Sequence, residues 1–140
     1  MERKILAVLL DSGDTLVDEG TEIKDATGIV LQASLIPGAE EMVRGLKERG
    51  YRLGLVADGP AGTFHNILGH YGLLDLFDAL AISEQVGVEK PHPAMFTTAL
   101  RQLDLNESQH RQVIMVGNNL SRDIKGANSL GLISVWLDWS

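Results

Sequence analysis

The fold of this chain is decided by the stretch Ile5-Leu6-Ala7-Val8-Leu9-Leu10-Asp11-Ser12-Gly13-Asp14-Thr15. It opens with an unbroken apolar run, residues 5–10, and turns polar at Asp11 without a transition. Because the apolar residues do not alternate with polar ones, the run is typical of a strand buried on both faces, as in a parallel sheet. The polar residues after it would then lie at the carboxyl end of the strand, where such sheets bind ligands.

More apolar runs follow the first one, and helical patterns separate most of them. The runs are Leu53–Val56, Leu80–Ile82, Val113–Val116 and Leu132–Leu137. Apolar residues at helical spacing occur within Met42–Leu46, Phe64–Tyr71, Phe96–Leu103 and Leu120–Leu130. This alternation predicts a single α/β domain over residues 1–140, with a doubly wound, Rossmann-like parallel sheet of about five strands and flanking helices.

The segment between Leu16 and Pro37 carries no helical stripe. Two β-prone stretches, Thr21–Lys24 and Ile29–Leu35, flank a turn-forming Ala26-Thr27-Gly28 sequence, so we expect a small hairpin beyond the first strand. Three apolar residues near this hairpin have no obvious local partner, and they are Leu31, Leu35 and Ile36. We therefore expect a homo-oligomer with the hairpin region near its interface. The alternative is that these residues pack onto the domain's own sheet.

Composition excludes several classes of function. The 140 residues include 12 basic and 19 acidic side chains, a net charge of −7, so we expect no nucleic-acid or anionic-membrane surface. The chain has no cysteine, which excludes disulfides, thiolate zinc sites and cysteine nucleophiles. The first apolar run is too short for a signal-peptide core and no later run approaches a membrane span, so we expect a cytoplasmic protein.

Polar residues that can carry chemistry lie near the ends of these runs. Asp11 and Asp58 follow the first and second runs, Lys90 lies a short loop beyond the third, and Asn118 follows the fourth, with Asp123 close behind. Because the carboxyl ends of parallel strands share one edge of a sheet, we expect these side chains to converge. An aspartate can attack phosphorus, a divalent ion can neutralise crowded carboxylates, and a lysine can stabilise the transferred charge.

Four motifs, in this order along the chain, resemble those of the haloacid dehalogenase superfamily, whose members are mostly phosphatases. The motifs are Leu9–Leu16, Leu53–Gly59, Val88–Pro93 and Met115–Ile124. The resemblance implies a Rossmann-like core, a phosphorylated substrate and an aspartyl-phosphate intermediate on Asp11, with Lys90 balancing charge. It also implies Mg²⁺, held by Asp11, the Gly13 carbonyl and either Asn118 or Asp123.

The resemblance also bears on how the substrate is bound. We expect the substrate to contact Ser12, Asp58, Gly59 and Asn119. Many members insert a long helical cap after the first motif, whereas here the predicted hairpin occupies that place. In such families a missing cap goes with an open site, a macromolecular substrate or a cap supplied by a neighbouring subunit.

Three positions depart from the family pattern. The first motif usually carries a second aspartate as general acid and base, and Gly13 stands there instead. Ala57 replaces a serine or threonine that bonds a phosphoryl oxygen, and Asn118 replaces an acidic metal ligand. Because leaving-group protonation contributes about 10²–10⁴-fold to rate, we expect at most a weakly active phosphatase. Asp58 is one candidate for the missing acid, although capping the Gly59-Pro60 turn or the next helix is the more ordinary role.

Two other functions fit these departures. One is a catalytically inactive relative that keeps the fold as a binding or assembly module. The other is a haloacid-type dehalogenase, since members with that activity also lack the acidic second residue and need no metal. The dehalogenase ranks lower because the capping domain that walls an apolar pocket in those enzymes is missing here. Hydrolysis of a test phosphate separates the phosphatase from the inactive module.

Overall fold

A five-stranded parallel sheet runs through the centre of the computed structural model, which describes residues 4–139. Its strands are β1 (Ala7–Leu10), β4 (Arg52–Ala57), β5 (Ala79–Ile82), β6 (Val113–Gly117) and β7 (Ile133–Trp136). They lie in the order β5-β4-β1-β6-β7, and every neighbouring pair is parallel. This confirms the predicted doubly wound α/β fold, with the apolar first strand in the middle of the sheet.

The register of β1 with its two neighbours decides which residues meet at the carboxyl edge of the sheet. Leu10 of β1 is level with Leu55 of β4 and with Val116 of β6. The residues that follow these three strands therefore emerge side by side. The strand order also reverses between β1 and β6, and open α/β sheets bind their ligands at such a switch point.

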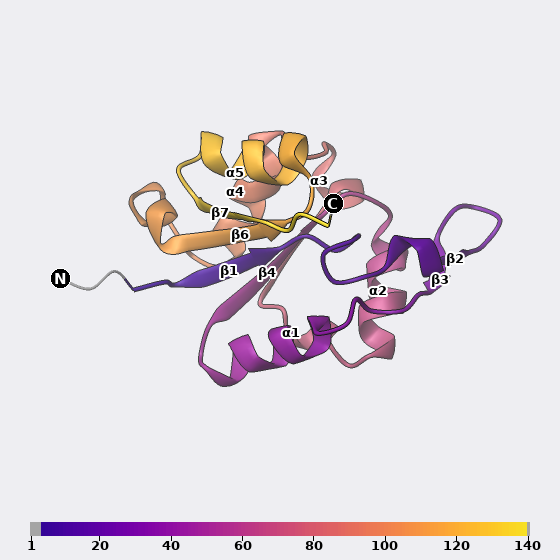
Figure 1. The fold of residues 1–140 in the computed structure, drawn as a ribbon. Coiled ribbons are helices and arrows are strands. Elements are labelled where there is room, and N and C mark those ends of the chain that lie inside the picture. The colour runs from indigo at the N-terminus through magenta and orange to yellow at the C-terminus, as the bar shows by residue number, and fades with distance from the viewer. Residues whose placement is uncertain (1–3, 140) are drawn as a thin grey trace.

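Helices cover both faces of the sheet (Figure 1). On one face lie α1 (Ala39–Glu48) and α2 (Ala61–His70), and on the other lie α4 (Pro93–Gln102) and α5 (Lys125–Ser129). The short helix α3 (Ser83–Val86) directly follows β5. The sheet is therefore enclosed on both sides, which is why its strands read as continuous apolar runs.

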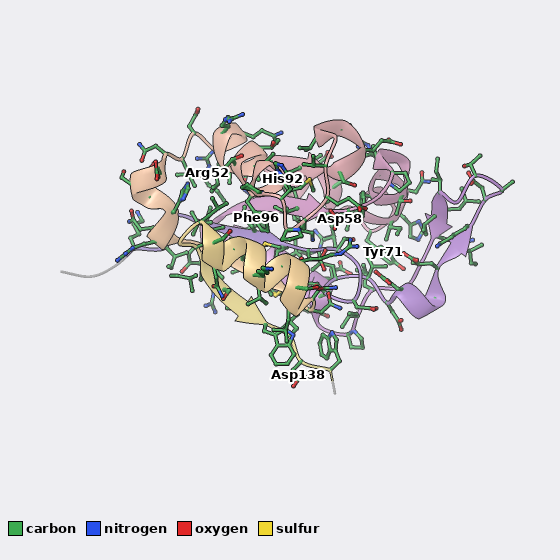
Figure 2. All side chains as sticks on the ribbon, turned by 90° about the horizontal axis from the view of Figure 1, so that it is seen from above. Arg52, Asp58, Tyr71, His92, Phe96 and Asp138 are labelled. Atoms are coloured by element: carbon green, nitrogen blue, oxygen red, sulfur yellow. The ribbon has the colours of Figure 1, made fainter. Side chains whose placement is uncertain are left out.

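Each face of the sheet closes its own hydrophobic core. Successive strand residues point to opposite faces, so Leu9 and Leu10 of β1 enter different cores. Leu10 packs in the core that contains Val43 of α1 and Phe64 of α2. Leu9 belongs to the core that contains the fully buried Phe96 of α4, which is labelled near the centre of Figure 2. The two cores hold β1 rigidly, and with it the residues that follow.

The predicted hairpin exists but is shorter than expected. It consists of β2 (Ile23–Lys24) and β3 (Val30–Gln32), which pair antiparallel and project beyond the end of the sheet (Figure 1). The side chain of Asp25 closes the turn by accepting the N–H groups of Thr27 and Ile29. These side-chain hydrogen bonds take the place of backbone pairs that the longer predicted strands would have formed.

The packing around the hairpin alters the basis of the homo-oligomer prediction. Leu35 and Ile36 pack against the core on the α1 and α2 face, so they have the local partners that the sequence did not reveal. Ile23 and Leu31 remain about half exposed, at 54% and 50%. Of the three residues on which that prediction depends, only Leu31 stays half exposed, and a homo-oligomer remains a prediction.

The last predicted helix, Leu120–Leu130, is divided into two parts. A π-helical turn covers Leu120–Ile124, and α5 follows at Lys125. Leu120 is 52% exposed, so its assignment to an apolar stripe was wrong. The local reason is that Asp123 turns inward, which rotates Leu120 towards solvent.

The remaining elements are short. Turns of 3₁₀ helix cover Glu19–Thr21, Leu74–Leu76 and Glu107–Gln112. Within residues 4–139, no helix has the length and apolar character needed to cross a bilayer. Residues 1–3 and 140 of the predicted domain lie outside the described part of the chain.

Candidate active site

A buried ammonium group lies between two carboxylates at the carboxyl edge of the sheet. Lys90 Nζ is 2.7 Å from Asp11 Oδ1 and 2.7 Å from Asp123 Oδ1. It also donates a hydrogen bond of 2.7 Å to the carbonyl of Val56 in β4. Lys90 is 4% exposed and Asp123 only 1%. The structure thus brings together three residues that the sequence predicted to converge from separate strand ends.

Burial and charge act on this cluster in opposite directions. Burial, with a smaller contribution from Asp123, raises the pKa of Asp11 from 3.8 to about 6, against the opposing effect of Lys90. Burial by itself lowers the pKa of Lys90, but the attraction of both carboxylates outweighs it and the pKa rises overall. With both carboxylates ionised, the cluster carries one negative charge in excess. An excess negative charge in a buried place favours the binding of a cation.

The end of β6 is shaped to admit Asp123. A Cβ atom at Gly117 would lie 2.2 Å from Asp123 Oδ2, so a side chain at position 117 would displace the carboxylate. The N–H group of Asn119 donates to the same oxygen at 3.1 Å. Asp123 is therefore held by the backbone of its own loop as well as by Lys90.

The side-chain amide of Asn118 lies beside Asp11 Oδ2, whereas Lys90 contacts Asp11 Oδ1. The side-chain amide of Asn118 places one atom 3.0 Å from Asp11 Oδ2 and 3.2 Å from the Gly13 carbonyl oxygen. If that atom is nitrogen, it donates to both oxygens. If it is oxygen, three oxygens face one another and require a cation between them. The structure gathers Asn118, rather than Asp123, with Asp11 and Gly13.

This group of atoms fits Mg²⁺. Mg²⁺ takes oxygen ligands at 2.0–2.1 Å in octahedral geometry, which puts neighbouring ligand oxygens about 2.9 Å apart. The distances around Asn118 are close to that spacing. Among residues 4–139 there is no group of three or more His, Cys, Asp and Glu side chains suited to a metal ion. Any Mg²⁺ here would therefore depend on an amide and a carbonyl oxygen beside the Asp11 carboxylate.

Asp58 is held by two donors at the edge of the site. Its Oδ1 accepts the N–H group of Lys90 at 2.9 Å, and its Oδ2 accepts from the Arg122 guanidinium at 2.9 Å. Figure 2 shows Asp58 between Arg52, at the start of β4, and the hairpin. Asp58 therefore positions the Lys90 loop, and it caps neither the Gly59-Pro60 turn nor α2 as the ordinary alternative assumed.

The other residues predicted to bind substrate use their polar groups within the fold. Asn119 Oδ1 caps the π-helical turn by accepting the N–H groups of Ser121 and Arg122. The N–H group of Gly59 donates to Ser83 Oγ at 2.7 Å. The carbonyl of Ser12 accepts N–H groups of the turn that follows β1. These three residues therefore stabilise the loops of the site, a role that their location after the strands did not indicate.

An open cavity of about 370 Å³ connects these residues. Asp11, Gly13, Asp58, Lys90 and Asn118 line it, whereas Ser12 does not and faces a neighbouring cavity. Asn119 and Asp123 also line the cavity. A phosphate group that enters it would therefore meet the Asp11 carboxylate and the predicted metal ligands together.

Sequence reasoning missed Arg122 and Glu19, both of which line this cavity. Arg122 lies within the fourth motif, so its spacing from Asp123 offered a signal. Glu19 lies six residues beyond Gly13, at the start of a 3₁₀ turn, and offered none. Its carboxyl group packs directly over Gly13, and a Cβ atom there would lie 1.8 Å from Glu19 Oε1. Burial and the nearby Asp14 raise the pKa of Glu19 above its ordinary value.

The pH dependence of stability tests the burial of Asp11. Its pKa rises on folding from 3.8 to about 6, so between these values the folded chain holds more protons than the unfolded chain. Stability then falls as pH rises through this window. In the presence of a chelator, we expect wild type to lose unfolding free energy relative to Asp11→Asn between about pH 4 and pH 7. Urea unfolding across this range measures the difference, and parallel curves for the two proteins contradict the burial.

Removal of Lys90 tests the charge balance. Lys90→Met leaves Asp11 and Asp123 buried without a counter-charge, which costs about 3–5 kcal/mol of unfolding free energy. Lys47→Met is the matched control, because Lys47 pairs with Asp78 at 2.6 Å while both side chains stay about a third exposed. That exposed pair contributes only about 0–1 kcal/mol. Urea unfolding at neutral pH compares the two, and equal losses contradict a buried charge cluster.

Relatives with known names match most of this chain. It is 37% identical to the glyceraldehyde 3-phosphate phosphatase of Pyrococcus abyssi over 105 residues, 74% of this chain and 42% of that protein. It is 33% identical to the ribulose-1,5-bisphosphate 5-phosphatase of Halopiger xanaduensis over 134 residues, 94% of this chain and 55% of that protein. The chain thus spans about half the length of these relatives.

A solved structure shares the fold of this chain, and a family model matches most of its length. The crystal structure of a HAD-superfamily hydrolase from Ehrlichia chaffeensis superposes with a TM-score of 0.81 at 18% identity, covering 97% of this chain and 89% of that one. The family model for haloacid dehalogenase-like hydrolases matches residues 2–131. The chain belongs to the haloacid dehalogenase-like hydrolase family.

Proposed function

We propose that this protein is a phosphatase that hydrolyses a phosphate monoester through an aspartyl-phosphate on Asp11. The observation that carries the proposal is the contact of the Asp11 carboxylate with Lys90 on one side and with the Asn118 amide, which also reaches the Gly13 carbonyl oxygen, on the other, at the wall of an open cavity. The phosphatase names of the relatives support this reaction class. Their different substrates leave the substrate of this chain open.

Asp11 would act as the nucleophile. Above its pKa of about 6 the side chain is an ionised carboxylate, which can attack phosphorus as the ester oxygen leaves. Lys90, held by Val56 and Asp123, would stabilise the negative charge of the aspartate and of the phosphoryl group. Because Lys90 is already bound by fixed partners, it would not reorient as the charge develops.

Mg²⁺ would be held by Asp11, the Gly13 carbonyl oxygen and Asn118. When bound, it supplies positive charge that neutralises the phosphate and the carboxylates. Asp123, the other predicted ligand, would instead keep Lys90 in place through its 2.7 Å contact. The Arg122 guanidinium at the rim would attract the incoming phosphate, since its side chain is 45% exposed. Cytoplasmic location and homo-oligomer formation stay predictions.

The nucleophile is tested by replacing Asp11 with its neutral isostere. We expect Asp11→Asn to abolish hydrolysis of p-nitrophenyl phosphate, because an amide does not attack phosphorus. Asp75→Asn is the matched control and should keep the activity, because Asp75 is exposed in the turn Leu74–Leu76 and does not line the cavity. Release of p-nitrophenol measures both. Turnover that persists in Asp11→Asn contradicts the mechanism, and an inactive wild type favours the binding-module alternative.

The metal site is tested by thermal unfolding. Excess Mg²⁺ should raise the Tm of wild type by mass action, and the shift should be lost in Asp11→Asn. Asn118→Asp adds a charged ligand, so it should bind Mg²⁺ roughly tenfold more tightly and show a larger shift at the same concentration. Ca²⁺, a larger ion, serves as the comparison. Equal shifts in all three proteins, or none in wild type, would contradict a metal site at these residues.

A further inference from the structure

We propose that the Glu19 carboxyl group performs the proton transfers for which Gly13 has no side chain. Glu19 would protonate the leaving group and then accept a proton from the attacking water. This inference rests on the proposed phosphatase function and assigns its acid-base residue. It gives a catalytic role to a residue that lies outside the four motifs.

The position of the Glu19 carboxyl group carries the inference. The volume above the Cα atom of Gly13 is occupied by this group, since a Cβ atom built there lies 1.8 Å from Glu19 Oε1 and 2.8 Å from its carboxyl carbon. A side chain two residues beyond Asp11 on an extended strand end would project into this same volume. Glu19 and Asp11 line the same cavity. An acid from elsewhere in the chain therefore stands where an acid at position 13 would stand.

The loop after β1 holds Glu19 in this place. The N–H group of Asp14 donates to the Val17 carbonyl, and the N–H group of Asp18 donates to the Ser34 carbonyl beyond the hairpin. The N–H group of Glu19 itself donates to Asp14 Oδ1 at 3.0 Å. These contacts fold the loop back on its own start. Because Glu19 bonds the loop through its backbone, these contacts do not use its carboxyl group.

Other acidic residues near the cavity are committed to positioning roles. Both oxygens of Asp58 accept hydrogen bonds, from the Lys90 N–H group and from Arg122. Asp14 accepts the N–H group of Glu19. Asp123 contacts Lys90 and accepts the N–H group of Asn119. Glu19 is thus the lining acid best placed to exchange a proton with a bound substrate.

One carboxyl group is sufficient to donate and then recover the proton that the reaction needs. In the first step, an oxygen of Asp11 bonds to phosphorus, the bond from phosphorus to the ester oxygen breaks, and that oxygen takes the proton of Glu19. In the second step, Glu19, now a carboxylate, accepts a proton from water while the water oxygen attacks phosphorus. The bond between Asp11 and phosphorus breaks, which releases phosphate and restores both residues.

Two esters with different leaving groups test this role. Propyl phosphate needs a proton on its leaving oxygen, whereas p-nitrophenyl phosphate releases a stable anion. Glu19→Gln should lower kcat/KM for propyl phosphate by about 10²–10⁴-fold. With p-nitrophenyl phosphate, the first step should survive, giving a burst of one p-nitrophenol per chain followed by slow turnover. Glu22→Gln is the matched control, since Glu22 does not line the cavity that contains Asp11, and it should behave as wild type.

Exchanging the two positions provides a second, independent test. Gly13 is absent from the residues with left-handed backbone, so an aspartate there is not strained by its φ angle. Gly13→Asp alone should bring no gain, because two carboxyl groups then compete for one volume. Glu19→Ala alone should lose activity, and the double variant Gly13→Asp/Glu19→Ala should recover at least tenfold over Glu19→Ala. Such recovery would show that one acid at this place is what the reaction needs, even if Glu19→Gln folds poorly.

The outcomes separate this inference from the proposed function. If wild type hydrolyses both esters and Glu19→Gln matches it on propyl phosphate, the inference is overturned and the phosphatase assignment stands. If Glu19→Ala loses activity and the double variant does not recover it, the inference is also overturned. If wild type hydrolyses neither ester, the proposed function fails and the role of Glu19 fails with it.

Discussion

One buried ammonium group holds the functional edge of this protein together. Lys90 lies within ion-pair distance of both Asp11 and Asp123, and it reaches across the sheet edge to the carbonyl of Val56. Without it, two carboxylates would share a poorly solvated space at a large cost in free energy. With it, one negative charge remains in excess beside the Gly13 carbonyl and the Asn118 amide. In the proposed mechanism, this excess charge favours a bound Mg²⁺, which would offset the charge of an approaching phosphate dianion.

The features that followed from continuous apolar runs could be read from the sequence. A strand buried on both faces appears in the sequence as a continuous apolar run. The strands were therefore predictable, as was the edge of the sheet at which Asp11 and Lys90 lie. The helix predicted for Leu120–Leu130 is present, but its π-helical first turn was not predictable, because Asp123 turns inward beside Gly117 and Asn119 caps the turn. Side-chain capping and close backbone approach decide that local geometry, and periodicity carries no information about either.

The candidate site also shows why motif positions and functional groups need not coincide. Sequence reasoning asks which residue stands at a motif position. Gly13 was therefore interpreted as a lost acid, and Asp58, at the end of the second motif, as its possible replacement. The structure pairs Asp58 with Arg122 and brings the Glu19 carboxyl group over Gly13 instead. The path of that loop depends on hydrogen bonds to Asp14 and to the segment beyond the hairpin. Such long-range loop contacts leave no pattern in the sequence.

The central claim is that Asp11 is phosphorylated during turnover, and trapping the intermediate tests it most directly. Wild type is mixed with p-nitrophenyl phosphate and Mg²⁺, quenched in acid within the first turnover, digested and analysed by mass spectrometry. The account predicts one acid-stable, base-labile phosphoryl group per chain, on the peptide that contains Asp11. Hydrolysis that proceeds without a trapped phosphoryl group, or with one on a different residue, would contradict the account.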